Sequence, residues 1–300
     1  MKNIIVIAGA TASGKTDLAI RLAKALDGEV VSADSMQVYK KMDIGTAKPD
    51  EEEMAGVKHH MLSVAEPYEP YSAQDFAKGA KLAIDDITSR GKMPIVAGGT
   101  GMYLDILTGR MDFDAPKSDE KVRSELTRIY ENEGIDALYD LFLKEAGEYE
   151  GKIHKNDVKR IMRAIERARS GFKKGEKTLI KEYNSIWFAI DIERDRLYNK
   201  IDRRVDVMIE KGLLDEVRNV IVPIRDKCTT SLQSIGYKEV LMYFDGDISY
   251  DEMTELIKKR SRNYAKRQLT WFRRNEDIHW LESDNAFEEA LDIINKRGFD

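Results

Sequence analysis

The 300-residue sequence predicts an α/β fold, a parallel sheet flanked by helices and interrupted by an all-helical insertion. Three observations predict it. Short, almost wholly apolar runs rich in β-branched residues, typical of buried parallel strands, occur at 3–8, 29–32 and 93–97. Helical patterns lie between these runs, and strand–helix alternation implies right-handed crossovers. Residues 117–184, in contrast, contain charged helical segments and no convincing strand.

The individual elements follow from the same patterns. After the first strand, Leu18, Leu22 and Ala25 recur at helical spacing, and Gly28 ends that helix. Further along we expect a loop-rich stretch at 40–72, an amphipathic helix at 73–89, a strand at 187–192 and mostly helix from Arg194 onward. The expected division is therefore a core of residues 1–114 and 185–300 with a helical insertion at 115–184.

Composition excludes several classes of protein. Hydrophobic residues make up 42% of the chain and charged residues 34%, which is too apolar for a disordered chain. The single cysteine, Cys228, excludes an intramolecular disulfide and a cysteine-based zinc site. No apolar run approaches the roughly 18 residues of a membrane span, and the run at 4–8 is too short for a secretory signal. We therefore expect a cytoplasmic monomer with no membrane partner.

A glycine-rich segment, GATASGKT, follows the first strand, precedes a helix and fits G-x-x-x-x-G-K-(S/T) in full. Glycines allow backbone N–H groups to surround phosphate oxygens, and the helix adds the positive end of its dipole. Lys15 supplies a positive charge, and Thr16 supplies a hydroxyl for Mg²⁺. The segment predicts a P-loop NTPase-like core whose phosphate-binding residues are Gly9, Ala10, Thr11, Ala12, Ser13, Gly14, Lys15 and Thr16.

The loop alone leaves the identity of the phosphate compound open. P-loop kinases and ATPases usually have a second apolar strand that ends in an Asp near Mg²⁺. Here the candidate strand, residues 93–97, is followed by Gly98-Gly99-Thr100-Gly101 without a carboxylate. This argues mildly against ATP hydrolysis and favours a loop that holds a phosphate-bearing leaving group.

Asp34 follows the second predicted strand. Ligands of open parallel sheets bind beyond the carboxyl ends of the strands, so Asp34 is expected near the phosphate site. Three roles fit this position: a general base, a metal ligand acting through water, and a cap of the next turn. Position alone does not separate them.

The net charge of −5, from 49 basic and 54 acidic residues, argues at first against a nucleic acid partner. The charge is clustered, however. Residues 258–274 contain eight basic residues and no acidic one, with Tyr264, Trp271 and Phe272 between them. Residues 152–174 contain nine basic and two acidic residues. Such segments are typical both of nucleic acid binding with base stacking and of solvated helix faces, and both interpretations remain open.

Six segments, taken in chain order, resemble the tRNA dimethylallyltransferase (IPP transferase) family. They are GATASGKT (9–16), SADSMQVYKKMDIGTAKP (32–49), VAGGTGMYL (96–104), IHKNDVKRIMRAIE (153–166), SIGYKE (234–239) and YAKRQLTWFRR (264–274). The resemblance covers nearly the whole chain. Its most specific parts lie in the second and last segments, which ordinary kinases lack.

The resemblance implies transfer of a dimethylallyl group from dimethylallyl diphosphate to N6 of the adenosine on the 3′ side of the anticodon in tRNA. It implies that the glycine loop holds the diphosphate with Mg²⁺, that Asp34 is the general base, and that Lys15 and Thr100 complete the catalytic set. The helical insertion would bind the anticodon stem-loop. The implied tRNA contacts are Asp34, Ser35, Met36, Gln37, Thr100, Arg123, Lys159, Arg160, Ile161, Met162, Arg163, Gln233, Ser234, Ile235, Gly236, Tyr237, Lys238, Lys266, Arg267, Gln268, Leu269, Thr270, Trp271, Phe272 and Arg273.

The sequence departs from the family pattern at three positions. Ala10 and Lys155 replace the usual prolines, and Lys238 replaces an arginine, which exchanges a bidentate group for a point charge. The alternatives are transfer to free adenylate or ATP, a small-molecule P-loop kinase, and an RNA-binding module with a vestigial site. The adjacent pair His59-His60 invites a metal interpretation, but neighbouring histidines rarely share a metal, and we expect a loop role.

Overall fold

The computed structural model describes residues 1–111, 119–171 and 181–299, and the chain divides into two compact units. The larger unit consists of Met1–Met111 and Leu179–Asp300, and the smaller of Asp112–Thr178. The two units are described separately below. No helix among the described residues is long and apolar enough to cross a membrane.

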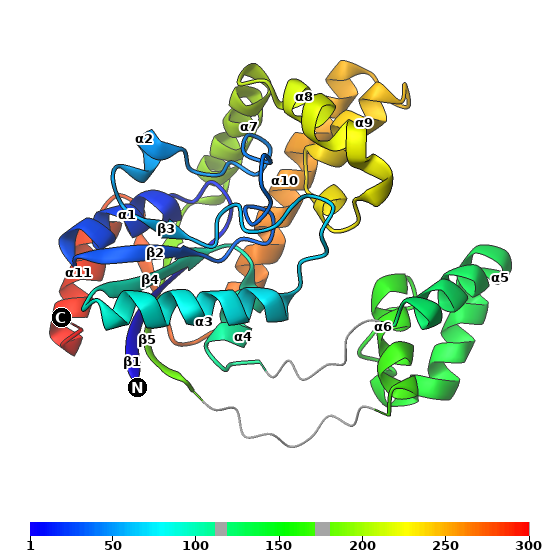
Figure 1. The fold of residues 1–300 in the computed structure, drawn as a ribbon, viewed down its shortest axis with the longest axis horizontal. Helices are drawn as coiled ribbons and strands as arrows, with labels where there is room; N and C mark the ends of the chain where they lie inside the picture. The colour runs from blue at the N-terminus through cyan, green and yellow to red at the C-terminus, as the bar shows by residue number, and fades with distance from the viewer. Residues whose placement is uncertain (112–118, 172–180, 300) are drawn as a thin grey trace. The chain divides into compact units, whose positions relative to one another are not determined.

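The larger unit is built on one parallel sheet with the strand order β3-β2-β4-β1-β5-β6 (Figure 1). Every strand pair is parallel, which confirms the predicted α/β sheet. The apolar run predicted as the first strand lies at the centre, and its residues 4–8 are fully buried. The strands are β1 (Lys2–Ala8), β2 (Gly28–Ser32), β3 (His59–His60), β4 (Met93–Gly98), β5 (Tyr183–Asp191) and β6 (Ile278–Glu282).

Both edge strands differ from the sequence-based expectation. β3 lies within the stretch expected to be loop, and β6 lies within the part expected to be mostly helix. β3 is only two polar residues long and exists because it pairs with Val30 and Val31 of β2. β5 also begins at Tyr183, two residues inside the segment expected to be helical. Long-range pairing, which no local pattern encodes, forms these edges.

Helices cover both faces of the sheet. Ile5 and Ile7 pack in a core with α1 and α11, while α3 covers the other face (Figure 1). The helices of this unit are α1 (Lys15–Ala25), α2 (Glu51–Met54), α3 (Ala73–Ser89), α4 (Gly101–Leu107), α7 (Arg194–Glu210), α8 (Leu213–Glu216), α9 (Tyr237–Phe244), α10 (Tyr250–Phe272) and α11 (Ala286–Arg297), with helical turns at Val217–Ile221, Val222–Lys227 and Ser231–Gln233.

A second hydrophobic core lies among α7, α8, α9 and α10. It contains Val205, Leu213, Val240 and Met253, and it also takes up Tyr39 from the segment that follows β2. The loop-rich stretch after β2 is therefore anchored to the helical part of the unit. This anchoring holds that stretch close to the carboxyl ends of the strands, where the candidate site lies.

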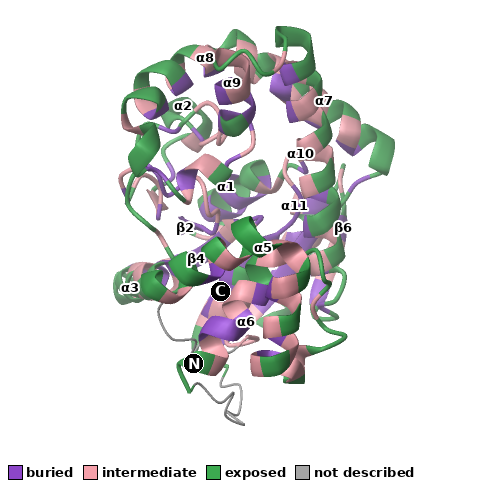
Figure 2. Cartoon of the chain, turned by 90° about the vertical axis from the view of Figure 1, so that its right-hand side faces the viewer, coloured by how far each residue is buried: buried purple, intermediate pink, exposed green. Residues whose placement is uncertain are grey.

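The smaller unit is helical in its described residues, with α5 (Glu120–Ala146), a 3₁₀ turn (Gly147–Tyr149) and α6 (Val158–Arg169). α5 is interrupted at Gly134, whose φ of 84° lies in the left-handed region that favours glycine. Leu126, Phe142, Ile161 and Ile165 form a separate core within this unit. Figure 2 shows buried residues of α6 in purple beside partly buried ones in pink.

Candidate active site

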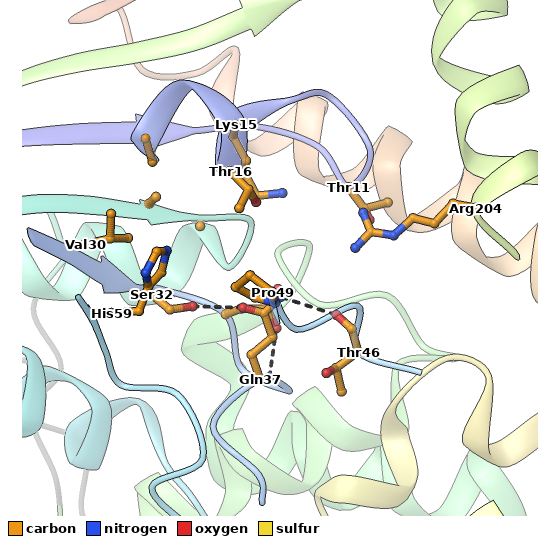
Figure 3. Close-up of a pocket in the computed structure, with 14 residues that line it drawn as sticks. Thr11, Lys15, Thr16, Val30, Ser32, Gln37, Thr46, Pro49, His59 and Arg204 are labelled. Atoms are coloured by element: carbon orange, nitrogen blue, oxygen red, sulfur yellow. Dashed lines mark hydrogen bonds between the residues drawn. The ribbon is translucent and has the colours of Figure 1, made fainter. Parts of the chain in front are cut away.

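A pocket lies at the carboxyl ends of β2 and β4, beside the glycine loop that follows β1 (Figure 3). Polar groups from five chain segments line it: the glycine loop with the start of α1, the end of β2 with the segment after it, the stretch at 46–49, β3, and α7. Among the lining residues are Thr11, Lys15, Thr16, Asp34, Gln37 and Arg204. This is the position at which open parallel sheets bind their ligands.

The glycine loop has the backbone that phosphate binding requires. Gly14 has a φ of 99°, and a Cβ on Gly9 would lie 3.0 Å from Ser13 Oγ. Gly14 also caps α1 without any side-chain hydrogen bond, so the first N–H groups of the helix remain available to a ligand. Ser13 Oγ is buried and has no hydrogen-bond partner among the described residues.

Two cationic side chains face this pocket. Lys15 Nζ donates to the Ala10 carbonyl at 3.2 Å, and burial, with a smaller effect of Arg204, lowers its pKa to about 8 although Asp34 opposes the shift. Arg204 makes long contacts, at 3.4 Å, to Thr11 Oγ1 and the Ala47 carbonyl. Burial lowers the pKa of Arg204, and the nearby Asp34 carboxylate partly compensates. Within the described ranges no carboxylate forms an ion pair with either cation, so the pocket favours an anion.

Asp34 both lines the pocket and caps a turn. Its Oδ1 accepts hydrogen bonds from the backbone N–H of Met36 at 2.9 Å and of Gln37 at 3.4 Å. The next residue, Ser35, donates its N–H to Thr100 Oγ1 at 3.0 Å. The structure thus brings together Asp34 and Thr100, two residues of the expected catalytic set, although they come from different strands.

Gln37 organises the stretch that closes one side of the pocket. Its Oε1 accepts from Ser32 Oγ at 3.0 Å, and its Nε2 donates to the Thr46 carbonyl at 3.3 Å (Figure 3). The same Nε2 also donates to the Ala47 carbonyl at 3.1 Å. Because both ends of its amide are engaged, Gln37 shapes the pocket wall.

Tyr237, which was expected to contact RNA, is fully buried. Its hydroxyl donates to Glu216 Oε1 at 2.5 Å. The Glu216 carboxylate in turn accepts from three consecutive backbone N–H groups, those of Asp43, Ile44 and Gly45, at 2.7–3.0 Å. Burial raises the pKa of Tyr237, so its hydroxyl remains a donor. Tyr237 and Glu216 therefore hold the segment that leads to the pocket wall.

The residues that precede and follow Tyr237 are unequally exposed. Ser234 and Gly236 are buried and Ile235 is partly buried, whereas Gln233 and Lys238 are exposed. Glu239, which is buried, accepts from the Gly236 N–H at 2.6 Å and forms an ion pair with Arg260. Of this set, only Gln233 and Lys238 have exposed side chains.

The basic segment at 258–274 is divided between two uses. Its first part is paired with carboxylates: Lys258 with Asp206 at 2.7 Å and Arg262 with Asp202 at 2.5 Å. The later part of α10 presents exposed side chains and alternates with buried or partly buried ones. Lys266, Arg267, Thr270 and Arg273 are exposed, Leu269 and Trp271 are partly buried, and Gln268 and Phe272 are buried.

In the smaller unit, part of the expected RNA-contact set is engaged internally. Arg123 and Arg163 both form ion pairs with the buried carboxylate of Glu166, at 2.8 and 3.0 Å. Ile161 is fully buried in the core of this unit. Met162 is partly buried, whereas Lys159 and Arg160 are exposed on α6.

Two titratable residues of the pocket were not recognised as site residues from the sequence. Arg204 belongs to a highly charged helix, where no local pattern distinguishes it from its neighbours. His59 lies in β3 and lines the pocket; its Nδ1 is 2.9 Å from the Val57 carbonyl, while its Nε2 is buried without a partner among the described residues. Burial lowers the pKa of His59. Only its pairing with β2 brings it to the site.

The neighbouring His60 belongs to a different cluster. Together with Glu29 and Asp86 it has the spacing of a metal site. Arg90, however, donates to both carboxylates, at 2.5 and 2.7 Å to Glu29 and at 2.8 Å to Asp86. The guanidinium occupies the position of a cation and neutralises the cluster, which favours a structural role.

Fold and site together define the class of the protein as a P-loop-like α/β protein with a pocket suited to an anionic, phosphate-bearing compound. Comparison with known families narrows this class. The model of the IPP transferase family matches residues 37–275, and that of isopentenyl transferase matches residues 2–67. The chain belongs to the IPP transferase family and is therefore a transferase.

Individual relatives agree with this assignment. The chain is 43% identical to a tRNA dimethylallyltransferase of Acetivibrio thermocellus over 98% of this chain and 96% of that protein. It is 42% identical to a tRNA dimethylallyltransferase of Clostridioides difficile, over 98% and 95%. A tRNA isopentenylpyrophosphate transferase from Bacillus halodurans superposes with a TM-score of 0.73 at 38% identity, over 99% of this chain and 96% of that chain. A eukaryotic dimethylallyltransferase solved acting on tRNA gives a TM-score of 0.82 at 30% identity, over 100% and 80%.

Proposed function

We propose that this protein transfers a dimethylallyl group from dimethylallyl diphosphate to N6 of the adenosine on the 3′ side of the anticodon in tRNA. The observation that carries the proposal is one pocket in which a diphosphate-binding loop faces the carboxylate of Asp34. The chain surrounding this pocket is 43% identical to a tRNA dimethylallyltransferase over nearly its full length.

The donor half of the pocket suits a diphosphate leaving group. The first N–H groups of α1 are left without a side-chain cap and are available to a phosphate, and Lys15 and Arg204 add two positive charges. Negative charge develops on the leaving diphosphate as the carbon–oxygen bond breaks. Fixed donors and cations in a partly buried pocket stabilise that charge without reorganising.

Thr16 is suited to hold Mg²⁺ beside the diphosphate. Its side chain lines the pocket, and its hydroxyl has no hydrogen-bond partner in the described part of the chain. Hydroxyl and phosphate oxygens are the hard ligands that Mg²⁺ prefers. When bound, the ion would neutralise part of the charge on the departing diphosphate.

The acceptor half requires a proton acceptor. As the bond between N6 and the first carbon of the dimethylallyl group forms, the bond from that carbon to the diphosphate oxygen breaks, and N6 loses one proton. Asp34 accepts this proton, while its other oxygen keeps the turn in place through the N–H of Met36. The base must leave its stack to enter the pocket, which is easiest in a single-stranded loop.

The RNA would contact exposed basic side chains of two segments. On α10 these are Lys266 and Arg267, with Arg273 directly after the helix. In the smaller unit they are Lys159 and Arg160 on α6, of which Arg160 also pairs with Asp157 at 3.4 Å. We assign the smaller unit to the anticodon stem-loop and expect the protein to act as a monomer. The eukaryotic relative is described as acting on tRNA, which supports the choice of substrate.

The decisive experiment supplies the purified protein with dimethylallyl diphosphate, Mg²⁺ and an isolated anticodon stem-loop. Mass spectrometry of the digested RNA should detect N6-dimethylallyl adenosine at the position next to the anticodon. Parallel reactions replace the RNA with AMP or ATP. Modification of the free nucleotide alone would favour an adenylate prenyltransferase, and no modified adenosine in any reaction would overturn the proposal.

A further inference from the structure

Gln268, in the later half of α10, connects the two loops that form the proposed active site. Its Oε1 accepts from the N–H of Thr11 in the glycine loop at 2.8 Å. Its Nε2 donates to the carbonyl of Gly99, in the loop after β4, at 2.9 Å. The side chain is only 5% exposed. Both polar atoms of the amide are therefore occupied by backbone groups.

The two partners determine the orientation of this amide. A backbone N–H must face the oxygen, and a carbonyl must face the nitrogen, so the Gln268 amide fits in one orientation only. Thr11 is further held by Arg204, whose Nη1 lies 3.4 Å from Thr11 Oγ1. Gly99 directly precedes Thr100, whose hydroxyl accepts from the Ser35 N–H beside Asp34. The Oε1 of Gln268 is thus connected to the half of the pocket that would bind the diphosphate donor. Its Nε2 is connected to the half that would bind the adenosine acceptor.

The loop after β4 is shaped to receive this face of α10. A Cβ on Gly99 would lie 2.1 Å from Gln268 Nε2, and a Cβ on Gly101 would lie 2.3 Å from Trp271 Cδ1. Trp271 is fixed in turn by the bond from its Nε1 to Asp105 Oδ2 at 2.9 Å. Glycines at these two positions therefore permit an approach that any other residue would prevent.

We propose that Gln268 is a positioning residue that sets the distance between the glycine loop and the loop after β4. It would thereby align the diphosphate-bearing carbon with the adenosine N6, and it would not contact RNA itself. The proposal rests on the proposed function, because alignment of two substrates has meaning only if both bind. Group transfer is sensitive to such spacing, since a misplacement of about 1 Å can lower the rate about 10²-fold.

The test compares variants that alter the bridge in different ways. Gln268→Met keeps the length of the side chain and removes both hydrogen bonds, whereas Gln268→Glu keeps the acceptor for Thr11 and removes the donor to Gly99. Gly99→Ala keeps glutamine at position 268, but the added Cβ, 2.1 Å from Nε2, forces the amide aside. Lys266→Gln is the matched control, because Lys266 lies on the exposed side of the same helix and is proposed to contact RNA.

Three quantities are measured: the single-turnover rate, the affinity for inorganic pyrophosphate with Mg²⁺ by calorimetry, and the affinity for the stem-loop by filter binding. For the two Gln268 variants and Gly99→Ala we expect the rate to fall about 10- to 100-fold. Pyrophosphate affinity should fall with it, and RNA affinity should stay within about twofold. Lys266→Gln should show the reverse pattern, with weaker RNA binding and unchanged pyrophosphate affinity.

The opposite pattern would overturn the inference. If Gln268→Glu weakened RNA binding because of its negative charge while pyrophosphate affinity stayed normal, Gln268 would be an RNA contact. Unchanged rates in all three variants would also reject it. Loss of the thermal unfolding transition identifies a variant that fails to fold. If the Gln268 variants do not fold, the rate and affinities of Gly99→Ala test the inference, because this variant keeps the Gln268 side chain. If the unaltered protein modifies no RNA, the proposed function fails, but the pyrophosphate measurement still tests the bridge.

Discussion

The pocket and the basic surface of α10 hold positive charge in opposite ways. In the pocket, Lys15 and Arg204 are partly buried and their pKa values are lowered by burial, yet neither has an ion-pair partner within the described ranges. Lys266 on the later half of α10 and Arg273 directly after the helix are exposed to water. Buried cations are few but strongly coupled to a ligand, whereas exposed ones are numerous and screened by salt.

The earlier half of α10 shows why counting basic residues overestimates a binding surface. Lys258 and Arg262 are basic in the sequence, but carboxylates of α7, Asp206 and Asp202, neutralise them. These pairs join two helices of the second hydrophobic core. The difference teaches that the partners of a charge, rather than its type, decide whether it is available to a ligand. Four substitutions or conditions test this contrast, from the largest effect to the smallest.

Loss of the proposed base should have the largest effect. Asp34→Asn keeps an oxygen that can accept from the Met36 N–H, so the turn survives while the proton acceptor is lost. We expect the single-turnover rate to fall by about 10²–10⁴-fold, the usual contribution of general-base catalysis. Pyrophosphate binding and the thermal transition serve as controls and should be unchanged. Full turnover by Asp34→Asn would reject the assignment of Asp34 as base.

Removal of the second pocket cation should come next. Arg204→Gln leaves the diphosphate with one fewer fixed positive charge, and we expect kcat/KM for dimethylallyl diphosphate to fall by about 10²–10³-fold. The matched control is Arg203→Gln, because Arg203 is the adjacent residue of α7 and is exposed. Equal effects of the two substitutions would show that net charge matters and that the pocket position does not.

A pH profile tests Lys15 without any substitution. Its pKa is lowered to about 8, so the unliganded protein loses this charge as the pH rises through that value. We expect kcat/KM for the donor to be constant below the pKa and to fall about tenfold per pH unit above it. Bound diphosphate raises the pKa of Lys15, so kcat should begin to fall at a higher pH than kcat/KM does. In Lys15→Arg, whatever its residual activity, the alkaline limb should be missing because a guanidinium stays protonated.

The sequence predicts the central part of this molecule well, because the relevant signals are local. The apolar runs of β1, β2 and β4, the glycine loop and Asp34 each follow from a few consecutive residues. Arg204 and His59 reach the pocket only through long-range packing. Arg204 is placed there because α7 packs against the loops at the ends of the strands, and His59 because β3 pairs with Val30 of β2. No pattern around either residue distinguishes it from an ordinary surface arginine or loop histidine.

Burial is the second property that local patterns miss. The motif around Tyr237 was expected to contact RNA as a whole, yet Tyr237 is fully buried and holds Glu216. Gln268 and Phe272 lie inside α10's packing surface although their neighbours Arg267 and Arg273 are exposed. A motif identifies a functional segment, but some of its residues are exposed on the surface while others are buried in the interior. Helical periodicity relative to the neighbouring elements separates them, and those neighbours are visible only in the fold.

The smallest effects should come from single exposed cations, and they should depend on salt. Lys266→Gln or Arg273→Gln would remove one phosphate contact, which should weaken stem-loop binding by a similar factor for every RNA sequence and lower the slope of log affinity against log salt by about 1. Lys258→Gln provides the comparison on the same helix, because Lys258 is already paired with Asp206 at 2.7 Å. It should leave the salt slope unchanged and cost about 0–1 kcal/mol in the free energy of unfolding. Filter binding at several salt concentrations and chemical denaturation measure the two quantities. A change of slope in Lys258→Gln equal to that in Lys266→Gln would mean that RNA displaces Asp206, and that ion-paired cations also belong to the binding surface.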